Sequence, residues 1–105
     1  MKSTTQNKSV FFSLFLLFLP ISVLAFTVPA RPRTYVNDYA KMLSAEQVGA
    51  LETKLENFEK QTTNEITVVT VSSLDGEPIE NVAQEIFTKW GIGKKDKNNG
   101  VLLLI

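Results

Sequence analysis

The chain has 105 residues, no cysteine, no histidine, and 11 basic against 11 acidic side chains. Without cysteine, a disulfide framework, a thiolate nucleophile and the common cysteine-based zinc sites are excluded. Without histidine, a Ser-His-Asp triad and an imidazole base are excluded. A net charge of zero argues against nucleic-acid binding, because that function usually needs a basic face. If the protein is an enzyme, its catalytic groups must be carboxylates, amides, hydroxyls, backbone groups or a bound hard cation.

Residues 1–25 have the pattern of a secretory signal peptide. Lys2 and Lys8 provide a cationic start, an apolar core follows, and small residues lead to Ala25. The favoured cleavage follows Ala25, and a cut after Ala30 is the alternative. The apolar stretch is shorter than the roughly 20 residues of a spanning helix, which disfavours an uncleaved anchor. The sequence therefore predicts export by the secretory pathway, to a periplasmic, extracellular or membrane-anchored location facing away from the cytoplasm.

The mature piece, residues 26–105, is expected to be part of a larger domain. Loss of Lys2 and Lys8 leaves nine basic and eleven acidic side chains, a net charge of −2. A piece of this size lies at the lower end of what buries its own core. The final run, 101–105, is wholly apolar and is typical of a strand buried on both faces, which needs neighbours on both sides. We therefore expect a chain truncated after a central strand.

The first half of the mature piece is expected to contain one clear helix. Residues 26–35 form an extended lead-in, because two prolines within four residues forbid a helix. Residues 36–43 are interpreted as a strand end or turn that enters a short helical turn. Ser44 and Gln47 fit a capping box. One apolar stripe follows, at Val48, Leu51, Leu55 and Phe58, while the other side is assigned to charged residues: Glu46, Glu52, Lys54, Glu56, Glu59 and Lys60.

In the second half of the mature piece the sequence predicts a strand, a helix and a further strand. Residues 65–71 are a β-branched run, the best strand in the chain. From Pro78 to Trp90 a wide apolar stripe predicts a helix, which places Phe87 and Trp90 in the core, and Gly91 suits its left-handed C-terminal cap. A polar loop, 93–100, precedes the last strand. A strand, a crossover helix and a buried strand indicate parallel pairing and an α/β layered domain.

Five segments in this order resemble the TPM domain family. They match an opening V-x-D-x-A…L-S signature, a first central strand, a second helix, a W-x-I-G exit and a D-N-G-V-L-L turn with its strand. The matching residues are Val36–Ala40 with Leu43–Ser44, Glu65–Val71, Ile79–Ala83, Phe87–Gly93 and Asn98–Ile105. The resemblance covers residues 36–105, nearly the whole mature piece, which it identifies as the N-terminal part of a TPM-like domain.

The resemblance implies a three-layer α/β/α sandwich around a mixed, mostly parallel sheet. It also implies a second half with further strands, a Gly-rich motif and an acidic helix, and in some relatives a transmembrane helix after the domain. Family members have been assigned phosphatase activity and binding of a divalent cation. Fold transfers between relatives more securely than activity does.

Asp38 is the one acid between the signal peptide and the first helix, and it occupies the aspartate of the family signature. A carboxylate in this position is a candidate ligand for Ca²⁺ or another divalent cation. The alternative is that Asp38 caps the turn at residues 39–43 by accepting hydrogen bonds from free backbone N–H groups.

Asn98 and Asn99 are further candidate cation ligands, because sites in layered α/β domains gather at strand ends and loops. Asn98 replaces the family's usual aspartate, which removes a charge. Turn chemistry alone also explains both asparagines and the following Gly100. Three lysines of the preceding loop could attract a phosphate group, but a loop whose charges face solvent is the favoured interpretation. These lysines are Lys94, Lys95 and Lys97.

Two functions are compatible with these features of the sequence. The first is a divalent-cation-dependent phosphatase acting on phosphate esters, in which a cation would do the work that histidine cannot. The second is an envelope module without enzymatic activity, which binds a partner protein or assists a membrane-associated complex. The absence of a dense catalytic cluster in the sequence favours the second function, with the catalytic residues unassigned.

Overall fold

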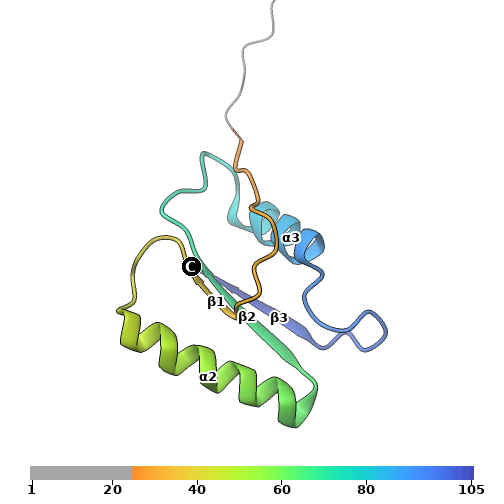
Figure 1. The fold of residues 1–105 in the computed structure, drawn as a ribbon. Helices are drawn as coiled ribbons and strands as arrows, with labels where there is room; N and C mark the ends of the chain where they lie inside the picture. The colour runs from red at the N-terminus through yellow and green to blue at the C-terminus, as the bar shows by residue number, and fades with distance from the viewer. Residues whose placement is uncertain (1–24) are drawn as a thin grey trace, which may run out of the picture.

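The protein is described over residues 25–105 of a computed structural model. Three parallel strands, β1 (Val36–Asp38), β2 (Glu65–Thr70) and β3 (Gly100–Leu104), form one sheet in the order β1-β2-β3. The helices α2 (Ala45–Thr62) and α3 (Ile79–Trp90) lie on opposite sides of this sheet (Figure 1). The predicted α/β/α layering is therefore confirmed, with all three described strands parallel.

Helix α2 begins where the sequence predicts. Ser44 Oγ accepts a hydrogen bond from the Gln47 backbone N–H at 3.1 Å, and the Gln47 side chain accepts one from the Ser44 N–H at 2.9 Å. This reciprocal pair satisfies two N–H groups that have no partner within the helix. Glu56 and Lys60, four residues apart on the exposed side of the helix, form an ion pair at 3.1 Å. The helix ends at Thr62, and the following Thr63 adopts a left-handed conformation that caps it.

Alternate residues of β2 face the two helices. Val68 packs with Val36 and Leu55 on the α2 side, whereas Val69 packs with residues of α3 on the other side. Because successive side chains of a strand point to opposite faces, a continuous β-branched run is what a strand covered on both faces requires. Two apolar cores therefore meet at this strand.

Helix α3 contributes the larger core. Val82, Ile86 and Trp90 are almost completely buried, and Phe87 packs against them half-buried, as the apolar stripe predicts. The helix stops at Gly91, whose left-handed φ of 60° lets its N–H return to carbonyls of the last turn. Within residues 25–105, neither helix is sufficiently long and apolar to cross a membrane.

The prediction that the last strand is buried on both faces is wrong for the described chain. Val101 and Leu103 are about half exposed, at 55% and 50%, as is Ile105. Strand β3 lies at the edge of the sheet, paired with β2 alone among the described residues. Its two remaining apolar residues, Leu102 and Leu104, pack against the α3 core. Helix α2 contacts β1 and β2, which leaves the α2-side residues of β3 uncovered.

Two local predictions also need correction. Residues 39–43 form a hydrogen-bonded turn and no helical turn. Glu52 was assigned to the solvent side of its helix, but it is half-buried. Its two carboxylate oxygens accept hydrogen bonds from the backbone N–H groups of Tyr35 and Val36, both at 2.8 Å. Glu52 therefore attaches α2 to the start of β1.

Candidate functional site

The carboxyl ends of β1 and β2 bring Asp38 and Thr70 together. These two residues are direct partners in the parallel register. The Thr70 hydroxyl donates a 2.5 Å hydrogen bond to Asp38 Oδ1 and accepts one from the Ala40 backbone N–H at 3.1 Å. Ligand sites of α/β sheets collect at this end of the strands, so the position suits a functional group.

Both oxygens of Asp38 are already engaged by its own chain. Oδ1 also accepts a hydrogen bond from the Met42 N–H at 3.0 Å, and Oδ2 accepts one from the Leu43 N–H at 2.9 Å. The Lys41 N–H donates to the Asp38 main-chain carbonyl at 3.2 Å. Four consecutive N–H groups, residues 40–43, are thus satisfied by Asp38 and Thr70. These contacts agree with the alternative given by the sequence, in which Asp38 caps the turn at residues 39–43.

The same contacts set the charge of the site. The hydrogen bond from Thr70, followed by the one from the Leu43 N–H, lowers the pKa of the Asp38 carboxyl below its ordinary value. The side chain is therefore ionised at neutral pH. Lys41 adopts a left-handed conformation, with φ of 53°, between the Ala40 N–H, which donates to the Thr70 hydroxyl, and the Met42 N–H, which donates to Asp38.

Asn98 and Asn99 lie at the opposite end of the sheet. Gly100 pairs with Glu65 at the start of β2, whereas Asp38 pairs with Thr70 at its end. Five residues along a strand span about 16 Å, at about 3.3 Å per residue. The structure therefore does not bring the three predicted cation ligands into one site.

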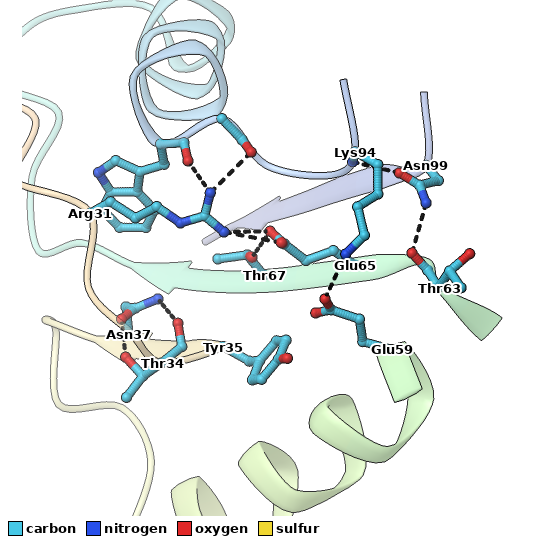
Figure 2. Close-up of polar contacts among 12 residues, drawn as sticks. Arg31, Thr34, Tyr35, Asn37, Glu59, Thr63, Glu65, Thr67, Lys94 and Asn99 are labelled. Atoms are coloured by element: carbon cyan, nitrogen blue, oxygen red, sulfur yellow. Dashed lines mark hydrogen bonds and ion pairs between the residues drawn. The ribbon is translucent and has the colours of Figure 1, made fainter. Parts of the chain in front are cut away.

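Asn99 connects three segments near the start of β3 (Figure 2). Its Oδ1 accepts a hydrogen bond from the Lys94 N–H, and its Nδ2 donates one to the Thr63 carbonyl at the end of α2, both at 2.7 Å. Its own carbonyl accepts from the Glu65 N–H at 3.0 Å. Asn98 adopts a left-handed φ of 46°, as turn asparagines do. These contacts fit the turn interpretation of both residues.

The loop lysines are exposed, and one of them has an identified partner. Lys94 Nζ lies 3.2 Å from Glu59 Oε1 of α2. This ion pair connects the loop to the helix beside the Asn99 contacts. Lys95 and Lys97 are exposed as well, which agrees with a solvated loop.

A polar cleft that the sequence did not predict lies between the lead-in and the start of β2 (Figure 2). It has a volume of about 400 Å³. The buried Glu65 accepts hydrogen bonds from Arg31 at 3.0 and 3.2 Å and from the Thr67 hydroxyl at 3.1 Å. The neighbouring Glu59 carboxylate, by hydrogen bonding and by its charge, raises the pKa of the Tyr35 phenol to about 12. In this cleft Arg31 and Glu65 are paired with each other, and Glu59 is paired with Lys94 of the neighbouring loop.

The described residues do not make a cation site on their own. Among residues 25–105 no three acidic side chains lie together in a way that could hold a metal ion. Both carboxylate oxygens of Asp38 accept hydrogen bonds from protein groups. Among the described residues, Asp38 is not part of any group of three acidic side chains that could bind a metal ion. Within residues 25–105, Asp38, Asn98 and Asn99 therefore do not form one divalent-cation site.

Comparison with known protein families agrees with this architecture. The family model described as the TPM domain matches residues 36–105, from the first residue of β1 to the residue after β3. A search of curated proteins finds no significant match to the chain. The family match covers well over half of the sequence and every described helix and strand. The chain therefore belongs to the TPM domain family.

Proposed function

We propose that this protein is an exported TPM-domain module that binds a partner, or assists assembly, in a membrane-associated complex of the cell envelope. The observation that carries the proposal is the state of Asp38. The one acid that the family signature offers for chemistry accepts three hydrogen bonds from its own chain. A carboxylate used in this way organises a loop at the end of a sheet, which supports a structural role for Asp38.

The export part of the proposal is supported by the N-terminal sequence. A cationic start, an apolar core and small residues before Ala25 are the features that the secretory machinery recognises. The absence of cysteine is compatible with an oxidising compartment, because the domain is stabilised by packing and hydrogen bonds.

The competing function is a divalent-cation-dependent phosphatase acting on phosphate esters. One observation favours it: Asp38 is ionised, with a lowered pKa, at the carboxyl end of two parallel strands. Ca²⁺ prefers carboxylate and carbonyl oxygens, so this position would suit one of its ligands if further acids joined it.

Two measurements on the full-length protein separate these functions. The protein is isolated from envelope membranes in mild detergent, cross-linked, and sized by native electrophoresis. A defined assembly larger than the protein alone, together with no hydrolysis of p-nitrophenyl phosphate in the presence of Ca²⁺, is expected. A protein that runs alone and hydrolyses the ester in a Ca²⁺-dependent manner would support the phosphatase and reject the module.

A further inference from the structure

Residues Phe26–Arg31, here called the N-terminal strap, run along the α3 side of the sheet (Figure 1). Val28 is 7% exposed and belongs to the same buried core as Val82, Ile86 and Trp90. Phe26 packs against this core half-buried. The strap has no regular secondary structure, yet it supplies apolar surface that α3 alone would leave open.

The strap is also hydrogen-bonded to the last turn of α3. Lys89 Nζ donates to the Val28 carbonyl at 2.7 Å, and the Trp90 indole N–H donates to the Pro29 carbonyl at 2.8 Å. A buried indole N–H without an acceptor is costly, so the Pro29 carbonyl has a specific role. Neither contact could be anticipated from sequence spacing, since about sixty residues separate the partners.

Arg31 fastens the end of the strap at two places (Figure 2). One guanidinium nitrogen donates to the carbonyls of Trp90 and Gly91, the latter at 3.0 Å, at the C-terminus of α3. The other nitrogen pairs with the Glu65 carboxylate at 3.0 Å. The Glu65 side chain is only 9% exposed, so its charge needs this partner. The helix terminus, where carbonyls concentrate negative charge, favours a cation as well.

These contacts bear on where the precursor is cut. The sequence permits removal of the leader after Ala25 or after Ala30. Ala25 is exposed and precedes the strap, whereas Ala30 lies within it, between Pro29 and Arg31. A cut after Ala30 would remove Val28 from the core and the Pro29 carbonyl from Trp90.

We infer that the precursor is processed at the Ala25–Phe26 bond and that Phe26 becomes the N-terminus of a strap required for the folded domain. In this step water adds across the peptide bond, leaving a carboxylate on Ala25 and an ammonium group on Phe26. The hydrolysis is carried out by the leader-removing peptidase of the export machinery. The inference rests on the export part of the proposed function.

The first test is the mass and N-terminal sequence of the full-length protein after secretion from a bacterial host. A chain beginning at Phe26 is expected. A chain beginning at Arg31 would overturn the inference while leaving export intact. A chain that keeps Met1 and is found only in the cytoplasm of that host would contradict export as well, whereas one that keeps Met1 in the membrane would contradict the processing site alone.

The second test measures the strap's contribution in the secreted protein. Val28→Ala should lower the thermal midpoint by several degrees, whereas Thr27→Ala, at the exposed neighbouring position, should leave it nearly unchanged. Deletion of residues 26–30 should lower the midpoint further and shift the fluorescence of Trp90, the single tryptophan, to longer wavelength. Equal midpoints for the two alanine variants would show that the strap is not part of the fold and would overturn the inference.

Discussion

The Thr70 hydroxyl donates a 2.5 Å hydrogen bond to the carboxylate of Asp38, thirty-two residues earlier in the chain. This contact joins the ends of two neighbouring parallel strands. Through it, one threonine and one aspartate satisfy the four consecutive N–H groups of the turn that leads to α2. The aspartate of the family signature thus has a structural task that is independent of any ligand.

Asp38→Asn should lower the free energy of unfolding at neutral pH. It should also make that free energy less dependent on pH in the acidic range. In the substituted side chain an amide NH₂ would face the Met42 or the Leu43 N–H, so one donor loses its acceptor. The pKa of Asp38 is lowered in the folded protein, so its contribution is present above about pH 4 and is lost as the pH falls through the folded-state value. Urea unfolding of the full-length protein between pH 2 and pH 7 measures this.

Asp96→Asn is the matched control, because it makes the same charge change in an exposed loop. Its unfolding midpoints should follow those of the wild type across the pH range. If Asp38→Asn behaved in the same way as this control, the structural role of Asp38 would be refuted.

Tyr35 should titrate well above an ordinary tyrosine. The Glu59 carboxylate favours the neutral phenol and raises its pKa to about 12. A raised folded-state value means that the stabilisation is complete below about pH 10 and is lost as the pH rises toward 12. The phenolate absorbance of wild type minus Tyr35→Phe isolates this residue, with circular dichroism confirming that both proteins remain folded.

Glu59→Gln should move the Tyr35 titration back toward pH 10. Glu56→Gln, which removes a weaker charge effect, should move it less. If the pKa of Tyr35 were the same in Glu59→Gln as in the wild type, Glu59 would not be the cause of the raised pKa.

The same substitution should have opposite effects at two glycines. A Cβ at Gly100 would lie 2.5 Å from the carbonyl oxygen of Ile92, so Gly100→Ala should destabilise the protein by about 1–3 kcal/mol. Gly49 lies within α2 and a Cβ there meets nothing within 4 Å, so Gly49→Ala should stabilise by about 0.5–1 kcal/mol. Chemical denaturation of both variants measures the difference. Destabilisation by Gly49→Ala, or none by Gly100→Ala, would contradict the packing described here.

The regular elements were predictable because their signals are local. The capping box at Ser44, the β-branched run of β2 and the apolar stripe of α3 each lie within one segment, and each appears close to its predicted bounds. Glu52 could also have been found, since it follows Val48 by four residues and so borders the buried stripe. A charged residue at the border of the apolar stripe can be half-buried when its carboxylate has backbone donors, as Glu52 does.

The candidate site was less predictable because it depends on long-range pairing. The partnership of Asp38 with Thr70 follows from the register of β1 against β2, which no local pattern specifies. The separation of Asp38 from Asn99 also depends on β1 lying parallel to β2, whereas the sequence predicted parallel pairing only for β2 and β3. Arg31 was missed because an extended, proline-containing segment carries no periodic signal.

The central proposal is that Asp38 stabilises the fold of a partner-binding domain and takes no part in phosphate-ester hydrolysis. The most direct measurement is the rate of p-nitrophenyl phosphate hydrolysis by the full-length protein with Ca²⁺ and with chelator, for wild type, Asp38→Asn and Asp96→Asn. The account predicts no Ca²⁺-dependent hydrolysis above the buffer rate in any of the three. Hydrolysis that requires Ca²⁺, persists in Asp96→Asn and is lost in a folded Asp38→Asn protein would contradict it.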